Sequence, residues 1–205
     1  MAQIIKRNIK IMDDFITAFK GCKTILDLGT ARAGKLDKIC QAIGAIGEGW
    51  DIDPNMVNSA RKNSRISIHQ GDMCEVIKEK KTGSFDGVLM LDTMEHCSKR
   101  DIGSLLENAV RVARIVVVGT MPLEEVPRNH PGEFMQHQSS WNLDQVEALW
   151  GPKAFILHDP TFHLRLSSKK GSAYVEDLKK NTYHGQFPEW TLCVFRHDHN
   201  YKRFF

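Results

Sequence analysis

The sequence lacks a paired cysteine motif, a long apolar run and a recognisable leader. Its five cysteines, at positions 22, 40, 74, 97 and 193, are odd in number and include no C-x-x-C pair. This argues against a disulfide framework and a thiolate zinc site, and favours a reducing compartment. No stretch approaches the ~20 apolar residues of a membrane helix. No signal-peptide pattern follows Met1. We therefore expect a cytoplasmic protein that has no membrane partner.

The chain also has little net charge. Its 28 Lys and Arg against 25 Asp and Glu leave +3 over 205 residues, which by itself indicates neither nucleic acid nor membrane binding. Residues 160–205 hold eight basic and four acidic residues, so they carry +4 and the rest of the chain −1. An ordinary solvated surface explains this better than a mild attraction for an anionic substrate. With 41% apolar and 26% charged residues, the composition is that of a globular protein.

Short apolar segments alternate with helical patterns along the first 120 residues. Because the apolar segments are hydrophobic on both faces, they predict a parallel sheet covered on two sides, the doubly wound α/β arrangement. The predicted strands are 23–28, 47–52, 65–69, 85–91, 115–119, 153–158 and 190–197. The predicted helices are 3–20, 34–44, 54–63, 73–81, 101–113 and 142–150, the last with Asn142 as its cap.

Turns with glycine or acidic residues follow the first three predicted strands. The small-residue turn from Gly29 to Gly34 lets a ligand approach the backbone and the N–H groups of the next helix. Asp51, about 20 residues after the turn, suits the hydroxyls of a ribose, while Asp53 suits a helix cap before Pro54. Asp72 can cap a helix or accept a hydrogen bond from adenine. These turns indicate a nucleotide-type site.

The turns and the fourth strand, taken together, match the motif order of a known protein family. The succession Asp27-Leu-Gly29, Asp51-Ile-Asp53-Pro54, Gly71-Asp72 and Ser84-Phe-Asp86-Gly-Val-Leu-Met-Leu-Asp92-Thr-Met-Glu95-His96 resembles class I S-adenosylmethionine-dependent methyltransferases over about residues 23–120. The resemblance implies a Rossmann-like sheet of about seven strands, mostly parallel with one antiparallel C-terminal strand, and helices on both faces. It implies that these residues bind S-adenosylmethionine: Asp27, Gly29, Thr30, Ala31, Gly34, Asp51, Ile52, Asp72, Met73, Leu91 and Asp92.

The turn after the first strand departs from the family pattern D-x-G-x-G-x-G. Ala31 and Ala33 stand at the later glycine places, and Gly34 follows them. Because alanine is small enough to keep the turn, we expect weaker or re-aimed cofactor binding, with loss of catalysis as an alternative. A dinucleotide site fits less well, since the second and third glycines of G-x-G-x-x-G are absent.

Three histidines are candidates for the chemistry. The segment 129–146 resembles the loop and helix over the acceptor pocket of small-molecule O-methyltransferases, which implies His137 as a general base and His130 as the second choice. His96 is the third candidate. It ends Asp92-x-x-Glu95-His96, which is similar to the E-x-x-E-H metal site of small-RNA 2′-O-methyltransferases and of ubiquinone-pathway O-methyltransferases. A divalent metal there, with His130 or His137 as a further ligand, is the less favoured alternative.

The acceptor is expected to be a small molecule. The N/D-P-P-Y/F signature and a Pro-Cys pair are absent, which argues against methylation of DNA amines and of cytosine C5. We predict transfer to an oxygen or nitrogen of a small molecule or sugar. The alternatives are an RNA 2′-O-methyltransferase that uses a divalent metal, or a non-catalytic partner subunit. We expect one domain over 1–205: a cofactor-binding half (1–121), a substrate loop and cap elements (122–187), and a last strand and tail (188–205).

Overall fold

The fold is a central sheet between two layers of helices. The computed structural model describes residues 1–7, 9–61, 66–123, 136–160, 189–199 and 201. Its strands are β1 (Gln3–Lys6), β2 (Thr24–Leu28), β3 (Ile46–Asp51), β4 (Ser67–Gln70), β5 (Phe85–Leu91), β6 (Ala113–Leu123), β7 (Ala154–Asp159) and β8 (Glu189–Arg196). Its helices are α1 (Ile11–Phe19), α2 (Gly34–Ile43), α3 (Pro54–Arg61), α4 (Met73–Glu79), the 3-10 helix η1 (Met94–His96), α5 (Lys99–Val112) and α6 (Leu143–Trp150).

The described strands form one eight-stranded sheet in the order β1-β7-β8-β6-β5-β2-β3-β4. β8 runs antiparallel to β6 and β7, and every other pairing is parallel. The predicted doubly wound sheet with its antiparallel C-terminal strand is thus confirmed. The chain order reverses between β2 and β5, and in such sheets a ligand binds at the carboxyl ends of the strands beside that reversal.

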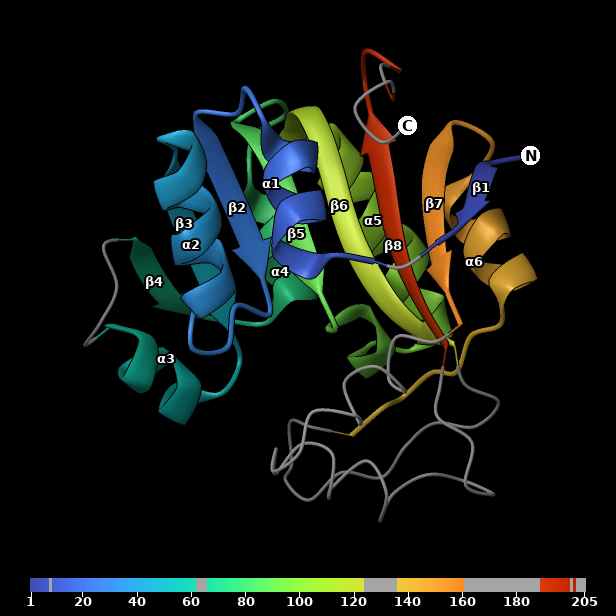
Figure 1. Cartoon of the computed structure of the whole chain (residues 1–205). Coiled ribbons are helices and arrows are strands. Elements are labelled where there is room, and N and C mark those ends of the chain that lie inside the picture. The colour runs from blue at the N-terminus through green and yellow to red at the C-terminus, as the bar shows by residue number, and fades with distance from the viewer. Residues whose placement is uncertain (8, 62–65, 124–135, 161–188, 200, 202–205) are drawn as a thin grey trace, which may run out of the picture.

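Two apolar cores hold the helices on the sheet (Figure 1). On one face α1 and α2 contribute Phe15, Phe19 and Leu36, all with no exposed surface. On the other face α4, α5 and α6 pack together, and their buried residues include Ile77 and Leu105. The continuous β-branched run in β6 is apolar on both sides because each side meets one of these cores.

The predicted helix over residues 3–20 is wrong in its first part. Residues 3–6 form β1, which pairs in parallel with β7 at the edge of the sheet, Ile4 opposite Ile156. The isoleucines that suggested helical periodicity are β-branched, and pairing with a distant strand outweighs their local spacing. The backbone N–H of Ile9 donates to a carboxylate oxygen of Asp159 at 2.7 Å. The helix itself begins only at Ile11.

Other boundaries differ by a few residues. Helix α5 begins at Lys99, earlier than predicted, because Ser98 caps it by accepting from the N–H of Asp101. β6 extends to Leu123, beyond the predicted end at 119. Asn142 caps α6 as predicted. The end of the predicted helix 54–63, the start of the predicted strand 65–69 and most of the predicted substrate segment 122–187 lie outside the described residues. The division into a cofactor half and a substrate segment stays a prediction.

None of the helices within the described ranges has the length and apolar character that crossing a membrane requires.

Candidate active site

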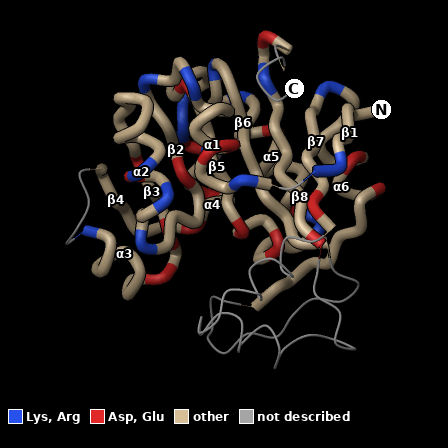
Figure 2. Tube along the Cα trace, in the orientation of Figure 1, with Lys and Arg blue, Asp and Glu red and all other residues tan. Residues whose placement is uncertain are grey.

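A pocket opens at the carboxyl ends of β2, β3, β4 and β5, beside the reversal of chain order. Its volume is about 650 Å³. Acidic residues lie at several places along this edge of the sheet (Figure 2). Among the residues that line it are Gly29, Ala31, Lys35, Asp51, Ile52, Asp53, Met56, Asp72, Met73, Cys74, Leu91, Asp92, Thr93, His96, Cys97, Gln136 and Gln138.

The turn after β2 forms one wall and has three residues with left-handed backbone. Gly29 has φ +75°, and a Cβ there would lie 2.1 Å from Oγ1 of Thr93, so only glycine fits. Ala31 and Ala33 have φ of 47° and 58°. Left-handed backbone costs a non-glycine residue roughly 1–2 kcal/mol. Ala31 and Ala33 therefore hold this turn at a cost in backbone strain.

Asp51 joins this turn to the end of β3. One carboxylate oxygen accepts from the N–H of Ala31 at 2.7 Å, and the other accepts from the N–H of Asp53 at 2.9 Å. Asp53 in turn accepts from the N–H of Asn55 at 2.8 Å, so it caps α3 as predicted. Asp51 therefore holds the turn after β2 against the end of β3, and Asp53 caps α3. Both residues line the pocket.

Asp27 lies behind the turn and does not line the pocket. The Asp27 side chain is 3% exposed, and Oδ2 accepts from the hydroxyl of Thr30 at 2.8 Å. Its Oδ1 is buried and has no hydrogen-bond partner among the described residues. Burial raises the pKa of Asp27 to about 7, against the opposing effects of Thr30 and Lys35. Thr30 and Gly34 are likewise not among the residues that line the pocket.

Asp72 caps α4 by accepting from the N–H of Cys74 at 2.7 Å. It also lines the pocket, so both predicted roles are open to it. Cys74 and Cys97 approach each other in the same wall, with their Sγ atoms 3.5 Å apart. The hydrogen bond with Cys97 lowers the pKa of the Cys74 thiol, whereas the pKa of Cys97 is raised.

Asp92 sits at the end of β5 with φ 46°, a strained position for a residue other than glycine. Its N–H donates to the hydroxyl of Thr120, and that hydroxyl donates back to the Asp92 carboxylate, both at 2.8 Å. The other carboxylate oxygen lies 3.8 Å from Nζ of Lys35. Strained residues of this kind are typical of functional sites.

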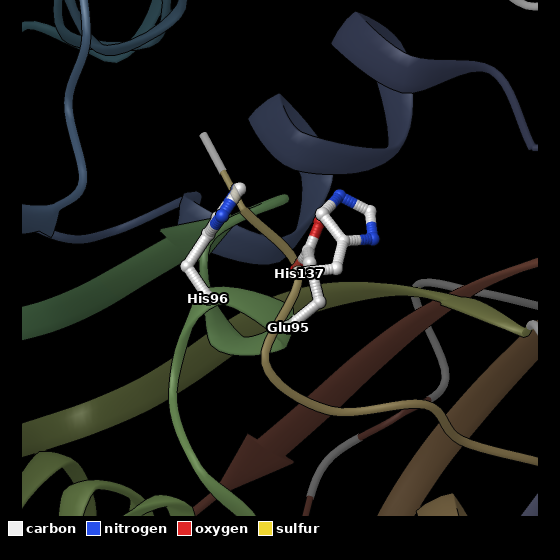
Figure 3. A group of neighbouring side chains, drawn as sticks. All are labelled: Glu95, His96 and His137. Atoms are coloured by element: carbon white, nitrogen blue, oxygen red, sulfur yellow. The ribbon is translucent and has the colours of Figure 1, made fainter. Parts of the chain in front are cut away.

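Glu95, His96 and His137 meet at the edge of the pocket (Figure 3). Glu95 and His96 belong to η1, and His137 comes from the segment before α6. One ligand atom from each lies within 4.8 Å of the others. Burial lowers the pKa of His96, which favours the neutral imidazole. His96 lines the pocket, but His137 does not. His130, the second predicted base, lies outside the described residues.

Sequence reasoning missed several polar residues of the lining. Lys35 lies on the first turn of α2, where the strand–turn–helix pattern could have indicated it. Thr93 follows Asp92 directly. Gln136 and Gln138 belong to a segment with no periodic pattern, so the sequence carried no signal for them.

Comparison with known proteins agrees with this fold. Residues 25–115 match the model of a methyltransferase domain. No curated protein matches the chain. Solved structures show the same fold, among them an S-adenosylmethionine-dependent methyltransferase from Archaeoglobus fulgidus, at 18% identity and TM-score 0.63, with 90% of each chain covered.

Two further structures with this fold hold S-adenosylhomocysteine. Phosphoethanolamine N-methyltransferase 2 from Haemonchus contortus is 18% identical with TM-score 0.64, over 89% of this chain and 52% of that one. Magnesium protoporphyrin IX methyltransferase from Synechocystis is 14% identical with TM-score 0.55, over 90% and 81%. The fold is thus that of class I S-adenosylmethionine-dependent methyltransferases. Residues 25–115 are the segment that matches a methyltransferase domain.

Proposed function

We propose that this protein is an S-adenosylmethionine-dependent methyltransferase that transfers a methyl group to an oxygen or nitrogen of a small molecule or sugar. The observation that carries the proposal is the position of His96, with Glu95 and His137 beside it, at the edge of the pocket that Asp51 and Asp72 line. Groups able to handle a proton thus lie next to the predicted cofactor site. The two relatives that hold S-adenosylhomocysteine carry names of small-molecule methyltransferases, which supports the same class of acceptor.

The residues of the pocket fit S-adenosylmethionine. Asp51 offers carboxylate oxygens suited to ribose hydroxyls, and Asp72 offers one to the amine of adenine. The side chains of Ile52, Met73 and Leu91 give the apolar surface that a base needs. Gly29 also lines the pocket, and the absence of a side chain there makes room for Thr93 in the same wall. When bound, S-adenosylmethionine supplies a methyl group on a positively charged sulfur.

The chain's own contribution is alignment and proton removal. Methyl transfer depends mostly on holding the acceptor atom in line with the methyl group and sulfur. A hydroxyl or a protonated amine must also lose a proton. Burial lowers the pKa of His96 and so favours its neutral form, and His96 lines the pocket, so it can accept that proton directly. The ring centroids of His96 and His137 are 5.0 Å apart and the rings are perpendicular.

The RNA-directed alternative rests on the basic C-terminal region, and most of its basic residues, from Arg165 to Lys180, lie outside the described residues. Within the described part, Lys and Arg are spread over several elements (Figure 2). Binding of nucleic acid therefore stays a prediction of second rank, as does the role of a non-catalytic partner.

The test has two steps. Calorimetric titration with S-adenosylmethionine and S-adenosylhomocysteine should give binding to the wild type and to Asp13→Asn, a control at an exposed carboxylate of α1. Release of S-adenosylhomocysteine is then measured with phosphorylated amino alcohols, sugars, phenols and short RNAs as acceptors. Turnover of a small molecule or sugar supports the proposal. Turnover of RNA alone, or binding without turnover of any class, would overturn the assigned acceptor.

A further inference from the structure

Glu95, His96 and His137 come from two segments that are 41 positions apart, counted from His96 to His137, yet their side chains meet (Figure 3). One carboxylate oxygen and two imidazole nitrogens lie within 4.8 Å of one another. The sequence grouped Asp92 with Glu95 and His96, whereas the structure ties the Asp92 carboxylate to Thr120 and Lys35. The arrangement in space thus selects a different third residue.

The backbone holds His137 in place on both sides. The carbonyl of Glu95 accepts from the N–H of Gln138 at 2.8 Å and from the N–H of Ser139 at 3.1 Å. On the other side of His137, the carbonyl of Gln136 lies 3.0 Å from Nδ1 of His96. The backbone that carries His137 is therefore fixed to η1 before any ligand binds, so the side chain of His137 is the part that has to move when a cation enters.

The hydrogen bond of His96 also sets which nitrogen can bind a cation. A carbonyl oxygen only accepts, so Nδ1 of His96 carries the proton and Nε2 carries the lone pair. A histidine that binds a metal typically donates its other ring N–H in this way, to a carbonyl or a carboxylate. Gln136 supplies the orienting contact that such a ligand needs.

The three donors also match a known coordination chemistry. One glutamate and two histidines suit zinc and the neighbouring divalent transition metals, and leave a coordination position open to water or substrate. Glu95 is 2% exposed, and buried carboxylates are typically paired or bound to metals. Around one tetrahedral ion the ligand atoms lie roughly 3.3 Å apart, so rotation of the half-buried His137 side chain would close the site.

We propose that Glu95, His96 and His137 bind a divalent cation of the zinc type at the edge of the pocket, and that this cation holds the oxygen of a hydroxyl acceptor. The role of the cation rests on the proposed function, but its binding does not. A bound cation lowers the pKa of the hydroxyl. With the cation bound, His96 and His137 serve as its ligands and water takes the place of His96 as the proton acceptor. The hydroxyl proton passes to water, the oxygen bonds to the methyl carbon, and the carbon–sulfur bond breaks with its electron pair left on sulfur. The acceptor is then an alcohol or a sugar hydroxyl, and not an amine.

The test measures cation binding in the absence of any acceptor. Chelator-treated protein is titrated with Co²⁺, whose visible absorption reports nitrogen and oxygen ligands, and with Zn²⁺ in competition with a chromophoric chelator. The wild type should bind one equivalent. His137→Ala should weaken binding at least about tenfold, since one of three ligands is lost. His197→Ala is the matched control, because Nε2 of that histidine donates to the carbonyl of Val110, away from the group, and should leave binding unchanged.

Glu95 is buried, so Glu95→Gln can fail to fold. The test of the cation site therefore relies on His137→Ala, because His137 is only half-buried. Equal cation affinity in the wild type and His137→Ala, or no binding by the wild type to either metal, would overturn the cation site. Titration with S-adenosylhomocysteine on the same samples separates this from the proposed function. Loss of cation binding with intact S-adenosylhomocysteine binding is expected for His137→Ala. If the wild type binds the cation but not S-adenosylhomocysteine, the proposed function is wrong and the cation site stands.

Discussion

The backbone N–H of Ala31 donates a hydrogen bond of 2.7 Å to the carboxylate of Asp51, twenty residues further along the chain. This contact joins the turn after β2 to the end of β3. Ala31 makes this contact from a left-handed backbone conformation, with φ 47°. Two features that the sequence suggested separately, a small-residue turn and an acid after the next strand, are thus one unit in the fold.

Replacing Asp51 should therefore affect both the turn and the ligand. Asp51→Ala is expected to weaken binding of S-adenosylhomocysteine by about 10- to 100-fold, because hydrogen bonds to a charged group contribute roughly 1.5–3 kcal/mol. Asp51→Asn keeps an acceptor for Ala31 and should lose less. Calorimetric titration of the two variants checks the order. Equal losses in both would show that the charge alone matters.

Replacing Ala31 with glycine should relieve strain. At φ 47° the alanine costs roughly 1–2 kcal/mol, and the added freedom of glycine in the unfolded chain offsets about 0.5–1 kcal/mol of the gain. The free energy of unfolding of Ala31→Gly should thus equal or exceed that of the wild type in urea titrations. Ala45→Gly, at a position without positive φ, should lower it by about 1 kcal/mol. If Ala31→Gly and Ala45→Gly lowered the free energy of unfolding equally, Ala31 would not be strained.

Adding a side chain at Gly29 should destabilise the turn. The new Cβ would meet Thr93 at 2.1 Å with φ in the left-handed region. Gly29→Ala should lower the free energy of unfolding by at least about 2 kcal/mol and abolish binding of S-adenosylhomocysteine. Gly103→Ala in α5, where nothing lies within 4 Å of the new Cβ, should instead raise stability by about 0.5–1 kcal/mol. If Gly29→Ala left both the free energy of unfolding and the binding of S-adenosylhomocysteine unchanged, the turn would not be constrained at this position.

The raised pKa of Asp27 predicts a dependence of stability on pH. Its pKa is about 7 in the folded protein, against 3.8 for an unburied aspartate. Between those two values the folded state binds the proton more tightly, so stability falls as the pH rises through this range and is constant above it. Asp27→Asn cannot ionise. The free energy of unfolding of the variant, relative to the wild type, should therefore rise from about pH 4 to pH 7 in urea titrations. A constant difference would exclude this ionisation.

Much of the site could be predicted because its features are local. Asp53 and Asn142 cap helices, and Asp51 lies at the end of a strand; each depends on a few neighbouring residues. The β1 strand could not be predicted, since its partner Ala154–Asp159 lies about 150 positions away and the local spacing of Ile4, Ile5 and Ile9 favoured a helix.

The proximity of His137 to Glu95 also could not be predicted from the local sequence. It depends on hydrogen bonds from the N–H groups of Gln138 and Ser139 to the carbonyl of Glu95. Backbone groups carry no sequence signal, so the pattern could offer His130 and His137 only as alternatives. For the same reason it kept Asp92 in the group, although its carboxylate is held by Thr120.

The thiol of Cys74 makes the pocket chemically addressable. Of the five cysteines, Cys74 alone is not buried, and the hydrogen bond with Cys97 lowers its pKa. Burial raises the pKa of Cys40 to about 11, and the pKa of Cys193 is raised for the same reason. Because the thiolate is the reactive form, an alkylating reagent at neutral pH should modify one position, in the pocket wall. The rate of that labelling then becomes a gauge of pocket occupancy, which a ligand slows by covering the sulfur.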